Sequence, residues 1–207
     1  MTQPDYFANH ARARQFPWTL YHAPIERDLG EFLGGVSGGT VLVVGCGLLH
    51  ELDDAPSGLA FVVADIDSRA VDAVMARRDP RIVDGIVVPP EAPIEIGRQV
   101  DAIYAKEVVE HVIAWPTWLA GLRRALVPGG RLWLSTPNYG EPWLPALEST
   151  VLELVARRSG FSRRHIHPTR FSKRSLARAL RAAGFEGVET RVTATRFAIT
   201  AWATAPR

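Results

Sequence analysis

Short apolar runs alternate along this chain with stretches of helical periodicity, and this alternation constrains the fold more than any other feature. Helical patterns cover Ser68–Arg77, with Ser68 as the expected N-cap, and Thr117–Leu126; a helix is also expected over Pro24–Leu33. The strand-like runs are residues 40–44, 60–64, 86–88, 101–105 and 131–135. Strands and helices in this order predict a doubly wound α/β fold, in which both faces of a parallel sheet are covered. A ligand would then bind beyond the carboxyl ends of the strands.

The C-terminal part of the chain has a different pattern. Residues 144–157 and 172–183 have helical periodicity, and Ser172 is the expected N-cap of the second helix. Residues 187–193 and 196–203 alternate or run apolar, which predicts two closing strands joined by a tight turn.

With 207 residues the chain is long enough for one domain with a full core and too short for two. We predict a single domain over residues 1–207, with an N-terminal helical lid at 1–38 and a substrate-cap insertion at 139–170. No apolar run approaches the 18 residues of a membrane span, and the first residues have no signal-peptide core. Because the single cysteine also excludes an internal disulfide, we expect a cytoplasmic protein without a membrane span.

Charge is unevenly distributed although the net charge is only +2. Nine basic residues and no acidic ones lie between Arg157 and Arg181. A solvated helix face explains such a segment most simply, and the alternative is an anionic substrate or nucleic-acid phosphates nearby.

A glycine turn comes directly after the first predicted strand. A helix is expected directly after Gly45-Cys46-Gly47. Because the two glycines have no Cβ atom, the backbone can approach a ligand closely beside the amides at the start of that helix. Asp65 comes twenty residues after Gly45, at the end of the second predicted strand, where a carboxylate can accept both ribose hydroxyls. The two features together predict a nucleotide-like ligand. His50 stands where the dinucleotide fingerprint needs a third glycine or alanine, and no P-loop motif occurs, so nicotinamide, flavin and P-loop sites are disfavoured.

Five motifs occur in order along the sequence: VLVVGCG, VVADID, DAIYAKEVVEHV, LVPGGRLWLSTPN and HIHPTRFSKRSLARALRAAGF. In this order they resemble class I S-adenosylmethionine-dependent methyltransferases, above all the branch that contains the ubiquinone-biosynthesis O-methyltransferases. The resemblance covers about residues 24–203. It implies a Rossmann-like seven-stranded sheet, mostly parallel with an antiparallel last strand. It also implies S-adenosylmethionine as the cofactor and S-adenosylhomocysteine as its product.

The resemblance implies how the cofactor is held. Gly45, Cys46 and Gly47 would surround its methionine part and ribose. Asp65 would hold the ribose hydroxyls, and Ile66 would lie against the adenine.

Further cofactor contacts are implied on other segments. Lys106, directly after the fourth predicted strand, would line the methionine part, and Tyr21 or His22 would cover it from the N-terminal helix. The family's adenine-binding acid after the third strand has only a weak match here, Glu91.

Two positions depart from the family pattern. Val43 replaces an acid two residues before the first glycine, and Leu49 replaces a third small residue. Both would weaken cofactor affinity, and Leu49 would narrow the pocket. These departures leave a non-catalytic S-adenosylmethionine-binding protein as one alternative function.

Methyl transfer from a sulfonium depends on holding the acceptor atom in line and excluding water. A base helps when the acceptor is a hydroxyl, and the imidazole of His111 is the expected catalytic base. The alternative is that His111 only packs at the start of a helix. We therefore predict methyl transfer to a small-molecule acceptor at a hydroxyl oxygen.

Glu107, Glu110 and His111 form an E-x-x-E-H pattern, whose spacing would place three metal-ligating groups on one helical face. His165 or His167 could add a ligand. Some ubiquinone-type O-methyltransferases and the RNA 2′-O-methyltransferases of small RNAs resemble this pattern and bind a divalent metal there. Metal-assisted RNA 2′-O-methylation is therefore a second alternative. The expected site is metal-free and no nucleic-acid partner is predicted, because no separate RNA-binding module is evident.

Aromatic side chains come after the fifth predicted strand, where acceptors approach in this fold. Tyr139 and Trp143 would form an apolar wall for a planar or lipid-like acceptor. Trp133, within the strand, is expected in the core.

Overall fold

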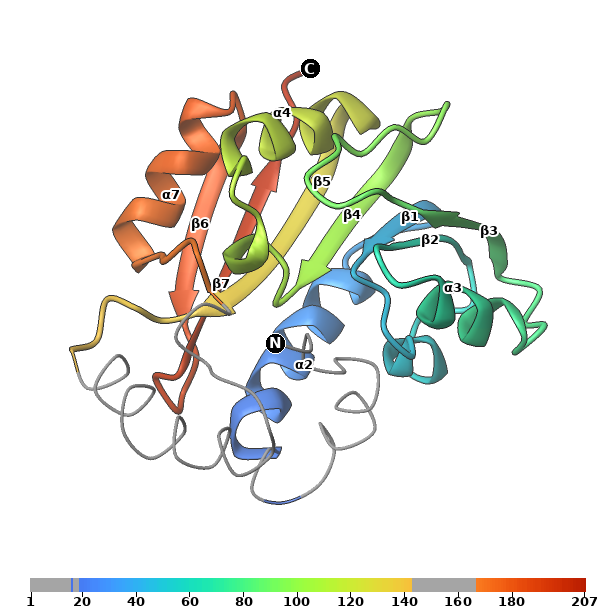
Figure 1. Ribbon diagram of the computed structural model, residues 1–207, viewed down its shortest axis with the longest axis horizontal. Helices are drawn as coiled ribbons and strands as arrows, with labels where there is room; N and C mark the ends of the chain where they lie inside the picture. Colours follow the sequence, from blue (N-terminus) through green and yellow to red (C-terminus); the bar gives the residue numbers. More distant parts are fainter. Residues whose placement is uncertain (1–15, 17–18, 143–166) are drawn as a thin grey trace.

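The computed structural model describes residues 16, 19–142 and 167–207, and a seven-stranded sheet forms its centre (Figure 1). The strands are β1 (Gly39–Val44), β2 (Leu59–Asp65), β3 (Ile82–Val87), β4 (Val100–Lys106), β5 (Leu126–Pro137), β6 (Glu186–Val192) and β7 (Ala198–Thr204). Their order in the sheet is β3-β2-β1-β4-β5-β7-β6. Among these strands, β7 alone runs opposite to the others and pairs antiparallel with β5 and β6. The predicted mostly parallel sheet with antiparallel closing strands is confirmed.

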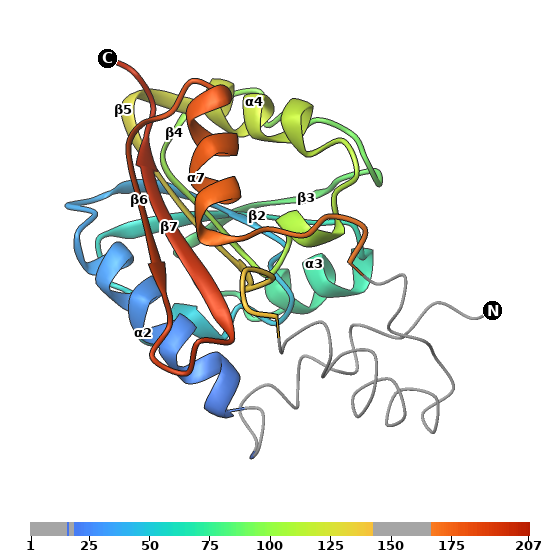
Figure 2. The ribbon, with the colours of Figure 1, turned by 90° about the vertical axis from the view of Figure 1, so that its left-hand side faces the viewer.

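The α-helices of the described ranges cover the two faces of the sheet. They are α2 (Thr19–Gly34), α3 (Ser68–Met75), α4 (Trp115–Ala125) and α7 (Lys173–Ala182). Figure 2 shows α4 and α7 on one side of β6 and β7, and α2 on the other. In β1, Val41 and Val43 pack with α2 and α3, whereas Leu42 and Val44 pack with α4 and α7. Successive strand residues point to opposite faces, so covering both faces requires the continuous apolar runs of the sequence.

The helices begin close to the predicted positions. Ser172 caps α7 and forms a capping box with Ser175, as predicted for this N-cap. The predicted cap of α3 at Ser68 is wrong, because Asp67 accepts the hydrogen bond from the Arg69 amide. Helix α2 begins at Thr19, earlier than its apolar pattern indicates.

The helix predicted directly after the glycine turn is absent. Between this turn and β2 the chain forms only η1, a 3-10 helix at His50–Asp53. Leu49 before it has left-handed backbone angles (φ 50°), and Pro56 soon after it disfavours helical geometry in the residue that precedes it. The crossover from β1 to β2 is therefore made almost without a helix.

Several predictions fall outside the described residues. These are the helix at 144–157, the side chains of Trp143 and His165, and most of the substrate-cap insertion at 139–170. Of the predicted lid at 1–38, the described part is mainly α2, whose Ile25, Leu29 and Phe32 are buried against the sheet. Among the described helices, none combines the length and the apolar character needed to cross a bilayer.

Candidate functional site

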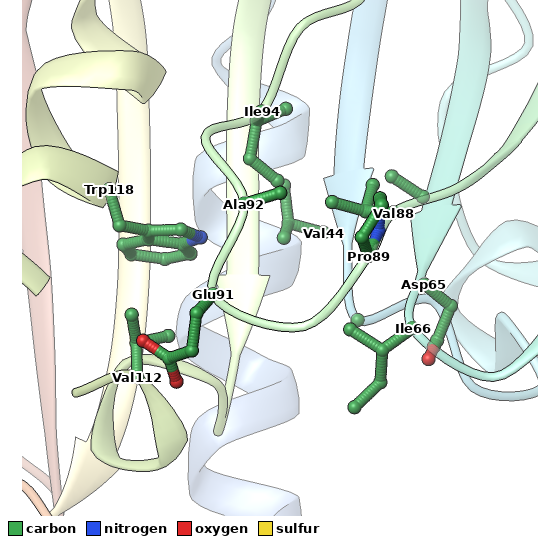
Figure 3. A pocket seen from close by; sticks show the side chains of 12 residues that line it. Val44, Asp65, Ile66, Val88, Pro89, Glu91, Ala92, Ile94, Val112 and Trp118 are labelled. Carbon is green, nitrogen blue, oxygen red and sulfur yellow. The ribbon is translucent and has the colours of Figure 1, made fainter. Parts of the chain in front are cut away.

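A pocket opens at the carboxyl ends of β1, β2 and β3, on the edge of the sheet where the fold predicts a ligand. Figure 3 shows Asp65 and Ile66 on one side of it and Trp118 and Val112 on the other, with Val44 between them. The pocket therefore combines one carboxylate with mostly apolar walls.

The glycine turn positions the backbone at the floor of this pocket. Gly45 has φ +70°, and its amide donates to the Ala64 carbonyl across to β2, 2.8 Å away. A Cβ at this position would lie 2.5 Å from Cγ2 of Val108. Gly47 has φ +50°, and its amide donates to Oδ2 of Asp65 at 3.1 Å. Both positions thus need the backbone freedom of glycine.

Gly45→Ala is expected to destabilise the fold by about 2–4 kcal/mol, from the left-handed backbone and the clash with Val108. Urea unfolding measures the loss. Gly30→Ala is the matched control, because nothing lies within 4 Å of a Cβ built at that helical position. The control should be neutral or slightly stabilising. Equal stability of the two variants would contradict the close packing at Gly45.

Two backbone amides hold the carboxylate of Asp65 in place. Oδ2 accepts from Gly47, and Oδ1 accepts from the amide of Asp67 at 3.0 Å. The Cys46 thiol also lies within hydrogen-bonding reach of this carboxylate, and because each carboxylate oxygen has two lone pairs, acceptor capacity remains for a ligand. A ribose with two neighbouring hydroxyls matches this pair of acceptors.

Apolar side chains form the rest of the pocket. Ile66 is 66% exposed at its rim, beside Val88 from the end of β3, and Trp118 of α4 is almost buried. Glu91 also lines the pocket, but its two oxygens accept from the amides of Ile113 and Ala114. Glu91, the weak match for an adenine-binding acid, therefore lines the predicted pocket, but its carboxylate caps the segment that leads into α4.

Cys46 and Leu49 lie beneath the turn and not in the pocket. Both side chains belong to the core on the α2 face. Burial and the neighbouring Asp65 raise the pKa of the Cys46 thiol, which stays neutral. The expectation that Leu49 narrows the pocket is wrong, because this side chain is 1% exposed in the core and does not line the pocket.

Lys106 ends β4 between two carboxylates. Its Nζ forms an ion pair with Glu51 of η1 and lies 3.9 Å from Oε1 of Glu26 on α2. The three side chains come from three separate segments and place both signs of charge beside the glycine turn. Sequence reasoning predicted Lys106 but neither of its partners.

Tyr21 of α2 reaches the end of β4. Its hydroxyl donates to Oε2 of Glu107, and the Ser135 hydroxyl donates to Oε1 at 2.8 Å. Burial raises the pKa of Glu107, and burial beside this carboxylate raises the pKa of Tyr21. The phenol therefore stays protonated and joins the N-terminal helix to the end of β4.

The prediction that Glu107, Glu110 and His111 lie on one helical face is wrong. Glu107 lies outside any helix with φ +58°, and its carboxylate is held by Tyr21 and Ser135. Glu110 and His111 come next on η2, a 3-10 helix at Val109–His111. Because Glu107 turns away, the ligand atoms that come together are those of Glu110, His111 and His167, all within 4.8 Å of one another.

His111 lies in a cluster of polar side chains at the carboxyl ends of β4 and β5. Its ring centroid is 4.9 Å from that of His167, and its Nε2 is 4.0 Å from Oε1 of the buried Glu110. The Tyr139 hydroxyl and Nδ1 of His167 share a hydrogen bond at 2.5 Å. His111 is partly exposed, so it can meet an acceptor, whereas Trp133 is fully buried as predicted.

Of the predicted cofactor residues, Cys46 and Gly47 do not line the pocket, and the other five fall into two groups. Gly45, Asp65 and Ile66 line the pocket. Lys106 and Tyr21 lie on the α2 side, bonded to Glu51 and Glu107 respectively. Sequence reasoning did not predict the apolar walls of the pocket, which are formed by Val88, Ile94, Val112 and Trp118. An isolated apolar residue looks the same in a sequence whether it lines a pocket or packs in the core.

Comparisons with known proteins show the family and the fold. Residues 7–190 match the family described as methyltransferase domain. No curated protein matches the sequence. Solved structures share the fold, among them the following three. A chain of the complex containing the Haloferax volcanii Trm112 methyltransferase activator is 17% identical, with 100% of both chains covered and a TM-score of 0.74.

The second structure is magnesium protoporphyrin IX methyltransferase from Synechocystis PCC 6803 with bound S-adenosylhomocysteine. It is 18% identical, with 97% of this chain and 96% of the other covered and a TM-score of 0.66. The third is Haemonchus contortus phosphoethanolamine N-methyltransferase 2 in complex with S-adenosylmethionine. It is 13% identical, with 100% of this chain and 61% of the other covered and a TM-score of 0.70.

Proposed function

Since the chain belongs to the methyltransferase domain family, we propose that it transfers a methyl group from S-adenosylmethionine to a hydroxyl oxygen of a small-molecule acceptor. The observation that carries this proposal is the position of Asp65. Its carboxylate is held by two backbone amides at the rim of a pocket with apolar walls. A ribose and a flat, mostly apolar base are the chemistry that such a pocket fits.

The acceptor would bind on the other side of the site, at His111. Bound S-adenosylmethionine supplies an electrophilic methyl carbon. The neutral imidazole takes the proton of the acceptor hydroxyl, and the buried Glu110 near it stabilises the imidazolium that results. Glu110 is buried, whereas His111 is partly exposed, so the bound donor and acceptor would have to exclude water from its ring, which favours transfer over hydrolysis.

The charges around Lys106 suit the amino-acid end of the donor. That end carries an ammonium and a carboxylate, and Glu26, Glu51 and Lys106 present both complementary signs. We expect the donor to compete with the ion pairs of Lys106. The carboxylate of the donor would then pair with Lys106, and the ammonium of the donor would pair with one of the two glutamates. Tyr21, fixed to Glu107, would cover this end from α2.

An assay of the purified protein tests the proposal. Tritium-labelled S-adenosylmethionine would be offered with pairs of acceptors that present either a hydroxyl or an amine on the same scaffold, and mass spectrometry would locate the methyl group. We expect methyl transfer to oxygen. Methylation at nitrogen or carbon alone would contradict the oxygen assignment. Binding without any turnover would favour the non-catalytic alternative.

One observation favours a second candidate function, metal-assisted methyl transfer to an RNA 2′-hydroxyl. Glu110, His111 and His167 offer one carboxylate and two imidazoles within 4.8 Å, a donor set that suits divalent transition metals. Their partial burial would hold the geometry. Against this candidate, a carboxylate and imidazoles at such distances also form hydrogen-bonded clusters without any metal.

Chelation separates the two candidates. For the metal-free mechanism we expect activity to change less than twofold after dialysis against EDTA. The metal-assisted candidate requires loss of most activity and its recovery with Mn²⁺. Glu110→Gln serves as the matched variant, because it removes the carboxylate that this cluster contributes. Metal analysis by mass spectrometry of the wild type and this variant would give a readout independent of turnover.

A further inference from the structure

We infer that the acceptor carries an anionic group, a carboxylate or a phosphate, and that Arg170 binds it. This inference rests on the proposed function, since it takes the His111 cluster as the acceptor site. It adds a charge requirement to the acceptor and names a residue that determines specificity.

The position of Arg170 relative to the cluster carries the inference. Its guanidinium carbon lies 5.2 Å from the centroid of the Tyr139 ring, in a cation–π contact. The hydroxyl of the same tyrosine bonds His167, whose ring lies against that of His111. Three consecutive side-chain contacts therefore connect Arg170 to the candidate base. A guanidinium stacked on a ring is already oriented and loses less entropy on binding a ligand.

Arg170 is exposed, and among the described residues no carboxylate forms an ion pair with it. Other arginines of this region differ. Arg196, for example, binds Glu141 beyond the end of β5 at 2.5 Å. The planar donors of Arg170 thus remain available, and a carboxylate or phosphate is the partner that this geometry fits best.

The surroundings of Arg170 strengthen the positive potential. Lys173 and Arg174 are exposed in the first turn of α7, and the amino end of this helix adds a partial positive charge. In the described part of the chain, the acids near this cluster are all engaged. Glu107 accepts from Tyr21 and Ser135, Glu110 is buried beside His111, and Glu141 is paired with Arg196. An acceptor could therefore place its hydroxyl at the His111 imidazole and its anionic group at the Arg170 guanidinium.

Calorimetry with paired probes tests the inference. The protein would be titrated, with and without saturating S-adenosylhomocysteine, with 4-hydroxyphenylacetate and its neutral amide, and with phenyl phosphate and phenol. We expect the wild type to bind at least one anion tenfold or more tightly than its neutral partner. The carboxylate and phosphate arms distinguish the two sources of negative charge.

Arg170→Gln should remove this preference and leave the affinity for the neutral probes within twofold. Arg178→Gln is the matched control, since it removes an exposed arginine further along α7 and should keep the preference. A wild type without any preference, an Arg170→Gln variant that retains it, or an equal loss for anionic and neutral probes would each overturn the inference. Binding of S-adenosylhomocysteine is measured in the same experiment, so failure of the proposed cofactor site shows separately.

Discussion

Asp65→Ala is expected to weaken the binding of S-adenosylmethionine about a hundredfold or more. The variant loses two hydrogen bonds from the ribose to a charged acceptor, each worth about 1.5–3 kcal/mol. A loss of about 3–6 kcal/mol corresponds to a factor of about 10²–10⁴ in affinity. The change also leaves the amides of Gly47 and Asp67 without the carboxylate that accepts their hydrogen bonds. The turn is then less well ordered, which weakens cofactor binding further. Isothermal titration calorimetry with S-adenosylmethionine and S-adenosylhomocysteine measures it.

The control for this variant is Asp84→Ala. Asp84 is a half-exposed carboxylate on the neighbouring strand β3 and does not line the pocket. Its removal changes the net charge equally and should leave both affinities within twofold. Unchanged affinity in Asp65→Ala would show that the cofactor binds elsewhere.

His111→Ala should lower turnover about 10²–10⁴-fold with a verified hydroxyl acceptor, the usual contribution of a general base. Cofactor affinity should stay within about threefold, because His111 does not line the pocket that contains Asp65. Single-turnover rates measure the chemical step, and calorimetry measures the binding.

His167→Ala gives the comparison that identifies the role of His111. If His111 is the base, loss of its ring neighbour should cost less than about tenfold, because His167 only helps to position it. If both histidines held a metal, each variant would lose activity to a similar extent and both would lose the ion. Turnover of His111→Ala equal to that of the wild type would remove His111 from the mechanism.

The sequence contained enough to predict the sheet because its signals are local. Runs of mostly β-branched residues such as Thr40–Val44 occur where a strand is buried on both faces. The Ser172 cap likewise acts within a few residues. The prediction of a helix after the glycine turn failed for an equally local reason, since Leu49 adopts left-handed angles and Pro56 disfavours helical geometry at Ala55.

The candidate site was only partly predictable, because its contacts join distant segments. Gly45 and Asp65 lie at the ends of strands that pair directly, so their spacing carried the prediction. The partners of Lys106 are 55 residues away in the case of Glu51 and on another helix in the case of Glu26. The bond between Tyr21 and Glu107 spans 86 residues, and no pattern of periodicity could have paired them.

The departures from the family pattern have different structural consequences. Leu49 takes the left-handed conformation that glycine adopts most easily, and its buried side chain packs with Leu52 and Cys46. Its bulk therefore supports the turn from below and leaves the pocket open. Val43, within β1, is buried on the same face as Leu49 and cannot contact the cofactor as an acid would.

A crystal structure of the protein with S-adenosylhomocysteine would test the cofactor site most directly. We predict both ribose hydroxyls within about 3.2 Å of the Asp65 carboxylate, the range of ordinary hydrogen bonds. The adenine should lie between Ile66, Val88 and Trp118. A ligand bound away from the glycine turn, or one whose ribose does not contact Asp65, would contradict the account.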